Sequence, residues 1–385
     1  MPSQTVASAR KLRVGVDASA LTSSRGPGRY LASMLAEMSG REDLDLIPIA
    51  PNAEVGQWDL PESLRTRIRP TGIPRTPWLS WRVPLAFSKL RPDVCWFPAN
   101  NGPLWGARPY VMTLHDIAQM RFPERFFDSE RERRSFEWRL RRDTSRAAAV
   151  VTDSEYSRRD IVDTLGCLEE RMRVVPIGVH PMFGPVPDTE ADRVLESLGV
   201  TRPYMLYVGG FDFRKNIPRL IEAFAEIAPT VPHALVLVGK SGANKSLYPD
   251  IEPVVEEHQL GRRTFILRGV TEDTTLRALY SAADLFVFPS IFEGFGLPPL
   301  EAMACGTAVA CSDAASLPEV VGDAAALFDP RSATDMAETV VGLLTDPVAR
   351  EALVARGAAR VGRFTWRSAA IQQAEILWSC SSHAG

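Results

Sequence analysis

Short apolar runs alternate with longer amphipathic stretches along almost the whole chain. Runs of this kind are typical of parallel strands buried on both faces, and the stretches between them have helical spacing. The apolar runs cover residues 12–18, 44–50, 94–98, 110–114, 147–152, 173–178, 204–208, 234–239, 265–269, 285–288, 307–310 and 325–328. Because strands and helices alternate, the pattern predicts an α/β protein with doubly wound parallel sheets.

The alternation stops once and then restarts, which predicts two domains. Residues 179–192 contain several prolines and are interpreted as the linker, and the second series begins at residue 204. We therefore expect an N-terminal domain over residues 1–182 and a C-terminal domain over residues 183–364. The length of 385 residues, 45% of them apolar, is sufficient for two separate cores.

Composition narrows the range of partners and compartments. A net charge of −3 gives no general attraction to nucleic acid. The five cysteines are scattered without C-x-x-C spacing, which favours a reducing compartment and no zinc site. The polar N-terminus lacks the apolar segment of a signal peptide, and no run approaches the ~18–20 apolar residues of a membrane span. We expect a cytoplasmic protein.

A glycine-rich acidic loop, residues 290–306, is the most informative stretch for function. It carries Glu293 and Glu301, with Gly294 and Gly296 between them, and becomes helical in its second part. Glycines let the backbone approach a ligand closely, and a helix N-terminus attracts anions. The loop can therefore hold a hydroxylated, anionic ligand. The alternative is an ordinary strand-to-helix loop whose glutamates are solvated.

A second glycine turn follows the apolar run 204–208. It begins at Gly209 and ends with Arg214 and Lys215, before a predicted helix for which Asn216 is a candidate cap. Two adjacent cations suit a diphosphate, since arginine offers a planar fork and lysine a point charge. The alternative is a pair of surface charges.

Two further candidates lie in the first half. Gly28 belongs to a glycine turn between the first strand and the first helix, but the spacing does not match the G-x-G-x-x-G pattern of dinucleotide sites. His115 and Asp116 follow the strand at 110–114, where parallel sheets bind ligands. A lone histidine is more often a packing residue, so spacing alone leaves its role open.

Taken together, these motifs resemble glycosyltransferase family 4, retaining enzymes of the GT-B fold. Glu293 and Glu301 with seven residues between them, the Gly-Phe-Gly after the first and the Glu-Ala-Met-Ala-Cys-Gly at the end are similar to the donor-site signature of that family. The Gly-Arg-Tyr at Gly28, the His-Asp pair and the Arg-Lys-Asn run extend the resemblance over nearly the full chain. It implies two Rossmann-like domains facing across a cleft, with a final helix in residues 365–385 completing the first domain.

The resemblance also implies an activity. Family members move a hexose from a nucleoside diphosphate sugar to a hydroxyl of a glycan or lipid-linked acceptor, and the Gly-Arg-Tyr and Arg-Lys-Asn motifs look most like bacterial mannosyl- and rhamnosyltransferases of surface polysaccharide assembly. GDP-mannose is the favoured donor, and no cofactor or metal is expected. Two alternatives are a GT-B-shaped nucleotide-sugar epimerase and a non-catalytic sugar-nucleotide-binding protein.

Residue roles are carried over from the family's motifs. His115, Glu293, Lys215 and Arg214 are the expected catalytic residues: His115 and Glu293 meet the donor sugar, and the two cations stabilise the diphosphate. Gly210 stands where some members have an arginine, and a missing charged hydrogen bond there would cost ~1.5–3 kcal/mol. The expected substrate contacts, with Glu301 on the ribose and Val270 near the nucleobase, are Gly28, Asp116, Gly209, Val270, Gly294, Phe295, Gly296, Leu297 and Glu301.

Two stretches combine arginines with aromatic residues. Residues 65–81 include Trp78 and Trp81, and residues 121–146 contain nine arginines against six acids, with aromatic residues interleaved. The main interpretation is a packed loop followed by a solvated, ion-paired helix. The alternative is peripheral contact with the inner face of a membrane.

Overall fold

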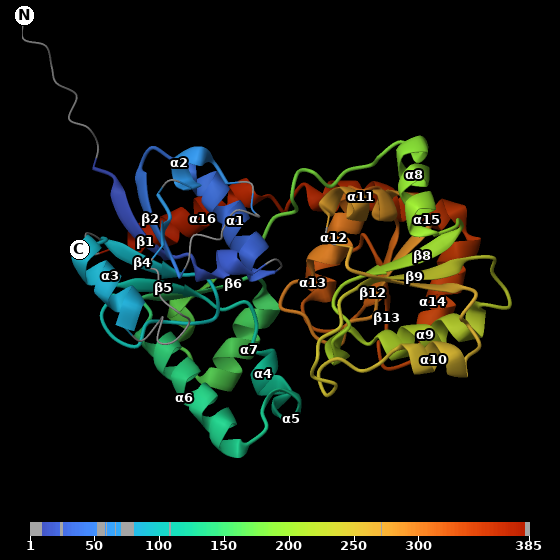
Figure 1. The fold of residues 1–385 in the computed structure, drawn as a ribbon, viewed down its shortest axis with the longest axis horizontal. Coiled ribbons are helices and arrows are strands. Elements are labelled where there is room, and N and C mark those ends of the chain that lie inside the picture. The colour runs from blue at the N-terminus through green and yellow to red at the C-terminus, as the bar shows by residue number, and fades with distance from the viewer. Residues whose placement is uncertain are drawn as a thin grey trace, which may run out of the picture.

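Two parallel sheets with helices on both faces lie side by side in the computed structural model (Figure 1). The structure describes residues 10–23, 26–51, 58, 60–65, 67–70, 81–107, 109–270 and 272–381. Within these ranges the sheet orders are β3-β2-β1-β4-β5-β6-β7 and β10-β9-β8-β11-β12-β13. Every pair of neighbouring strands is parallel.

The first sheet is built from the first half of the chain. Its strands are β1 (Leu12–Asp17), β2 (Leu44–Ala50), β3 (Arg69–Pro70), β4 (Val94–Phe97), β5 (Tyr110–Thr113), β6 (Ala149–Thr152) and β7 (Met172–Val174). Its helices are α1 (Pro27–Ser39), α2 (Glu62–Arg65), α3 (Val83–Leu90), α4 (Ala118–Arg121), α5 (Pro123–Phe126), α6 (Glu130–Arg146) and α7 (Glu155–Leu165). The strand order reverses between β1 and β4, so the loops after these strands leave the sheet in opposite directions.

The second sheet follows the same plan. Its strands are β8 (Tyr204–Val208), β9 (Ala234–Gly239), β10 (Thr264–Arg268), β11 (Leu285–Phe288), β12 (Val309–Ser312) and β13 (Ala326–Phe328). Its helices are α8 (Asp188–Leu198), α9 (Ile217–Ile227), α10 (Glu252–Glu257), α11 (Asp273–Ala282), α12 (Leu297–Ala304), α13 (Leu317–Val321), α14 (Ala333–Thr345) and α15 (Pro347–Val361), and the chain continues into a final helix, α16 (Trp366–Ser379). In such sheets ligands bind outside the carboxyl ends of the strands where the order reverses, here between β8 and β11.

Burial of the central strands explains why they appear in the sequence as continuous apolar runs. Strands β8, β9 and β11 are buried along their whole length. Helices cover both faces, so no strand position there faces water. The predicted α/β class with two Rossmann-like halves is confirmed, whereas the exact limits 1–182 and 183–364 stay a prediction.

Several predicted element boundaries were wrong for local reasons. The stretch 121–146 forms three helices, and α6 starts after Ser129, whose side chain caps the Glu132 N–H at 3.2 Å. Helix α14 is separated from α15 at Asp346, which caps α15. Helix α8 begins at Asp188, inside the predicted linker. Most of the predicted irregular stretch 65–81, including Trp78, lies outside the described residues.

The final helix returns to the first half of the molecule. Helix α16 packs against α1 and lies among the N-terminal elements in Figure 1. At the crossing, the Val179 N–H donates to the Phe364 carbonyl at 3.0 Å, and a Cβ added to Gly178 would lie 2.1 Å from the Trp366 backbone nitrogen. The two segments that connect the halves therefore run in contact, backbone to backbone, where only glycine fits.

We expect Gly178→Ala to destabilise the protein by about 1–3 kcal/mol, because backbone atoms of Trp366 must move to admit the methyl group. Differential scanning calorimetry would show a lower unfolding temperature. Gly184→Ala is the matched control, since an added Cβ there has nothing within 4 Å. Equal unfolding temperatures for the two variants would contradict the close approach at residue 178.

Candidate active site

An ion pair joins the two loops at the reversal point of the second sheet. Lys215 Nζ lies 2.5 Å from Glu293 Oε1, and both side chains are about 15% exposed or less. The same ammonium group lies 5.4 Å from the ring centroid of Phe288, at the end of β11. The structure thus brings together two residues that are far apart in the sequence. The sequence analysis assigned Glu293 to the donor sugar and Lys215 to the diphosphate.

Asn216 holds this arrangement in a way that the sequence did not predict. Its backbone is left-handed, with φ of 57°, and its side chain makes no capping bond to α9. The amide instead donates to the carbonyls of Pro289, at 3.2 Å, and Pro330, at 2.7 Å. The predicted capping role was therefore wrong; Asn216 ties the cationic turn to the loop after β11.

Arg214 is fixed beside Lys215. Its Nε donates to Asp212 Oδ1 at 2.8 Å, and its carbonyl accepts from the Ile291 N–H at 2.8 Å. The guanidinium lies 5.9 Å from the ring centroid of Phe126, which belongs to the first half. Burial acts to lower the pKa of Arg214, but the charges of Asp212 and Glu293 outweigh it and the net pKa is raised. The Arg214 guanidinium is therefore held in place where the two halves meet.

Glu301 is a buried carboxylate with partners from both halves. Tyr280 donates its hydroxyl to Oε2 at 3.1 Å, and Arg29 Nη1 lies 3.6 Å from Oε1. Arg29 also pairs with Asp273. Burial raises the pKa of Glu301, and the opposing effects of Arg29 and the Tyr280 hydrogen bond only partly offset it. The carboxylate is a buried hydrogen-bond acceptor.

His115 lies at the carboxyl end of β5. Its Nδ1 is 2.8 Å from Asp153 Oδ2, and its backbone N–H donates to Asn100 Oδ1 at 2.8 Å. Burial acts to lower the pKa of His115, but the charge of Asp153 and the hydrogen bond to it outweigh this, so the pKa is raised. Nε2 is buried and has no hydrogen-bond partner among the described residues. An orphaned buried ring nitrogen fits a hydroxyl of a ligand.

Gly294 brings the acidic loop against His115. A Cβ added to Gly294 would lie 2.5 Å from the His115 carbonyl oxygen and 3.0 Å from Asp116 Cβ. The carbonyl of Gly294 accepts hydroxyl hydrogen bonds from Ser154, at 2.7 Å, and Ser157, at 3.0 Å. The first turn of α7 in the first half is therefore bound to the loop that carries Glu293 and Glu301.

Glu319 makes a second contact with the same turn of α7. Its Oε1 accepts the Glu155 N–H at 2.8 Å and its Oε2 accepts the Tyr156 N–H at 3.0 Å. These are N–H groups that a helix leaves unpaired at its N-terminus, where a negative charge is also favoured. A carboxylate of α13 thus caps a helix of the other half.

Aromatic rings complete the contact between the halves. The Phe122 ring lies 5.1 Å from that of Phe213 and 5.7 Å from that of Phe292, and Phe126 lies 6.1 Å from Phe213. All of these pairs are edge-to-face, a favourable geometry for aromatic pairs. For the stretch that contains Phe122 and Phe126, the sequence predicted either a solvated helix or a membrane contact. In the structure both residues lie at the interface between the halves.

Comparison with known proteins now identifies the family. The sequence matches the family described as Glycosyltransferase Family 4 over residues 26–183 and that described as Glycosyl transferases group 1 over residues 188–360. It is 33% identical over 268 residues to O-antigen chain mannosyltransferase B of Escherichia coli, covering 68% of each chain. The chain belongs to glycosyltransferase family 4.

Two further comparisons agree with this glycosyltransferase assignment. The serotype-specific mannosyltransferase WbdA of Escherichia coli is 30% identical over 276 residues, which cover 71% of this chain and 33% of that protein. The solved structure of Anabaena HepE in complex with UDP and glucose superposes with a TM-score of 0.76, 18% identity and coverage of 96% of this chain and 100% of that one. The fold is GT-B, as the sequence predicted.

The glycines predicted at the edge of the glycosyltransferase site have packing roles in this structure. Gly28 lies in the first turn of α1, where an added Cβ would be 2.2 Å from the Ser23 carbonyl. Gly209 follows β8, and an added Cβ would be 2.3 Å from the Tyr207 hydroxyl oxygen. From the first glycine turn it is the neighbouring Arg29 that pairs with residues of the second half, Asp273 and Glu301. A role of Gly28 toward a substrate stays a prediction.

The other predicted substrate contacts lie in the acidic loop, after β5 and after β10. Gly296, with φ of 110°, precedes α12, which begins at Leu297, and Phe295 is buried with its ring 5.6 Å from that of Phe364. Asp116 Oδ1 accepts the Ala118 N–H at 2.9 Å. Val270 lines a surface pocket of 300 Å³ after β10. Their roles toward a substrate stay predictions.

Sequence reasoning did not assign a role in the site to five residues that the glycosyltransferase fold places there. They are Arg29, Asp153, Ser157, Asp273 and Tyr280. Arg29 had a signal, because it belongs to the Gly-Arg-Tyr motif. The others lie on loops and helices that come together only when the two halves pack. Short sequence motifs carry no information about that packing.

Two searches of the described part of the chain gave negative results. No group of three or more His, Cys, Asp and Glu side chains in it is placed to hold a metal ion. None of its helices combines the length and the apolar character needed to cross a membrane.

We expect Glu319→Gln to lower the turnover number of transfer about tenfold while leaving the donor KM within a few-fold. The substitution removes the charged acceptor of two α7 N–H groups, so the contact that holds Gly294 against His115 loosens. Steady-state kinetics gives both constants, and amide hydrogen exchange at Glu155 and Tyr156 should be faster. Glu338→Gln, an exposed change on α14, is the control. Unchanged turnover and exchange in Glu319→Gln would contradict the coupling.

Proposed function

We propose that this glycosyltransferase moves mannose from GDP-mannose to a hydroxyl of a lipid-linked or oligosaccharide acceptor, with retention of the anomeric configuration, in surface polysaccharide synthesis. The observation that carries the proposal is the Lys215–Glu293 pair at the reversal point of the second sheet, beside Arg214 and next to Gly294, which approaches the His115 backbone of the other half. The cation suits the diphosphate of a nucleotide sugar, and the neighbouring carboxylate suits the hydroxyls of its sugar.

The two cations would bind the diphosphate. Lys215 forms an ion pair with Glu293, and Arg214 forms one with Asp212. A donor diphosphate would compete with these carboxylates for the same N–H groups. Because the cations are already positioned and largely buried, they would stabilise the charge that develops on the leaving diphosphate without large rearrangement. This role requires no metal ion, and metal-independent transfer stays our prediction.

The carboxylates would then orient the donor. Released from Lys215, Glu293 would accept hydrogen bonds from hydroxyls of the sugar, and Glu301 would accept them from the ribose in place of Arg29. His115 would offer Nε2 to a sugar hydroxyl, with Asp153 fixing the ring through Nδ1. The acceptor would enter on the side of the first sheet, next to His115 and Asp116.

The names of the relatives support mannose and surface polysaccharide. O-antigen chain mannosyltransferase B and the serotype-specific mannosyltransferase WbdA are both named for mannosyl transfer in Escherichia coli. The structure of Anabaena HepE contains UDP and glucose, which supports a nucleoside diphosphate sugar as the donor class and makes UDP-glucose the competing donor. Synthesis would take place in the cytoplasm.

A thermal-shift panel with GDP-, UDP-, dTDP- and ADP-sugars tests the donor class. We expect one class to raise the unfolding temperature, because a ligand at 100 times its Kd stabilises by about 2.7 kcal/mol. Lys215→Ala should abolish the shift, while Lys245→Ala, which removes an exposed lysine paired with Asp250, should retain it. Indifference of the wild-type protein to all four classes would contradict the proposed donor site.

A second experiment tests Glu293. We expect Glu293→Ala to reduce mannosyl transfer by about 100-fold or more, since a mispositioned sugar loses the aligned geometry of the reaction. Nucleotide affinity, measured by titration calorimetry with GDP, should stay within a few-fold because the carboxylate faces the sugar. Full turnover in this variant would refute the role of Glu293, and sugar conversion without acceptor in the wild type would indicate an epimerase.

A further inference from the structure

Five large apolar side chains are exposed on adjoining parts of the first half. They are Trp81, Leu85, Leu104, Trp105 and Trp138, and we call them the aromatic patch. Trp138 is 61% exposed and Trp81 is 55% exposed. Single exposed apolar residues are ordinary, but a contiguous group of them marks an interaction surface.

Contacts between neighbouring elements make the patch continuous. The rings of Trp81 and Trp105 meet edge to face, with 5.9 Å between their centroids. Arg142 connects the loop to α6, since its Nη2 donates to the Pro103 carbonyl at 2.5 Å and its guanidinium lies 5.8 Å from the Trp138 ring centroid. The start of α3, the loop after β4 and the middle of α6 therefore present one surface.

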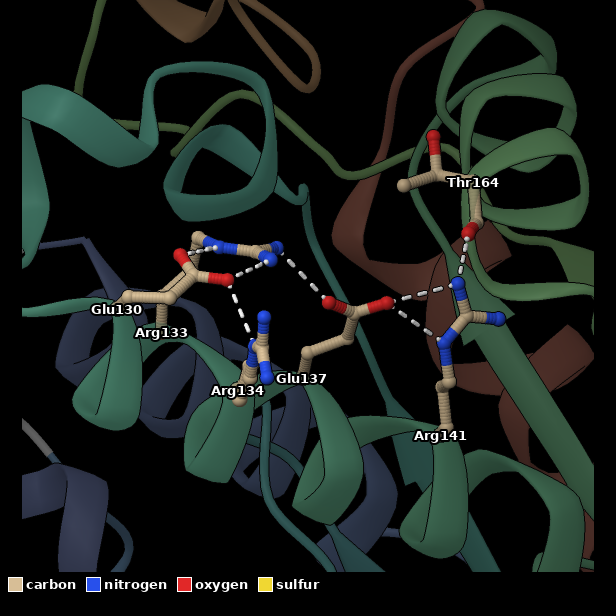
Figure 2. Close-up of polar contacts among 6 residues, drawn as sticks. All are labelled: Glu130, Arg133, Arg134, Glu137, Arg141 and Thr164. Carbon is tan, nitrogen blue, oxygen red and sulfur yellow. Dashed lines mark hydrogen bonds and ion pairs between the residues drawn. The ribbon is translucent and has the colours of Figure 1, made fainter.

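The charges of α6 are divided between two faces. Glu130 and Glu137 pair with arginines on one face, and Arg141 there also donates to the Thr164 carbonyl (Figure 2). Positions 131, 135, 138, 142 and 146 have the spacing of another face, and none of them is acidic. The ion-paired interpretation of this helix is thus confirmed for the face of Glu130 and Glu137, and on the other face Arg142 pairs with the buried Asp143.

Exposed cations lie on the same two helices as residues of the patch. Arg131, Arg139 and Arg146 are exposed on α6 around Trp138, and Lys89 is exposed one turn after Leu85 on α3. Tryptophan is favoured at the boundary between lipid tails and headgroups, and guanidinium groups bind phosphate well. Exposed apolar side chains with cations on the same helices are complementary to the surface of a bilayer that contains anionic lipid.

The patch is also connected to the proposed acceptor site. Asn100, which holds the backbone of His115, starts the segment that reaches Trp105 five residues later. Five residues span at most about 18 Å, so the patch lies within the reach of a short lipid-linked saccharide bound at His115.

We propose that the aromatic patch and the exposed cations on the same helices seat this protein on an anionic bilayer surface, where its acceptor is a saccharide anchored in the membrane. The bilayer contact stands on the exposed residues alone, whereas the anchored acceptor rests on the proposed function. The two parts therefore fail separately.

Co-sedimentation of the full chain with phosphatidylcholine vesicles, with and without phosphatidylglycerol, tests the contact. We expect binding that requires phosphatidylglycerol. Trp81→Ser with Trp138→Ser should weaken the partition coefficient at least about tenfold, and each of Arg131→Glu and Arg139→Glu should weaken it about fivefold or more. Val348→Ser and Arg367→Glu, exposed changes on α15 and α16, should leave it unchanged.

Each of the other possible outcomes contradicts one part of the proposal. Absence of binding to phosphatidylglycerol vesicles, or equal weakening by the control variants, would refute the bilayer contact. A lipid-free dimer that the tryptophan variants convert to a monomer would assign the patch to a second copy of the chain instead. If the patch variants lose vesicle binding and keep the nucleotide thermal shift, yet transfer to a membrane-anchored acceptor is undiminished, the anchored acceptor is wrong while the donor site stands.

Discussion

The close approach of Gly294 to His115 is the constraint on which the site depends. A side chain at position 294 would overlap the His115 carbonyl, and the Gly294 carbonyl is held by two serines of α7. Because this one residue contacts the first half both at its Cα and through its carbonyl, the acidic loop cannot shift without disturbing His115. The site is therefore a property of the assembled halves rather than of either sheet.

Charge balance in the site follows from the same assembly. Arg29 of the first half lies on Glu301 of the second, and Lys215 lies on Glu293, so buried charges are compensated. A buried charge without a partner is costly, whereas exchange of one partner for another of the same sign costs much less. This is the physical basis for a site that can accept a ligand carrying both hydroxyls and negative charge.

Much of the fold could be predicted because buried parallel strands leave continuous apolar runs. Strands β2 and β8 coincide with their predicted ranges, and the Glu-x₇-Glu loop, the cation pair and His115 were recognised from local motifs. The contacts between the halves could not be predicted in this way. Glu319 binds the N–H groups of residues more than 160 positions away, and Asn216 has the sequence position of a cap but bonds two distant carbonyls.

A crystal structure of the full chain with GDP-mannose tests the account most directly. We expect the diphosphate within hydrogen-bonding distance of Lys215 Nζ, the ribose hydroxyls on Glu301 and the sugar between Glu293 and His115. A nucleotide bound elsewhere, with the Lys215–Glu293 and Arg29–Glu301 pairs intact, would contradict the assignment of these groups to the donor.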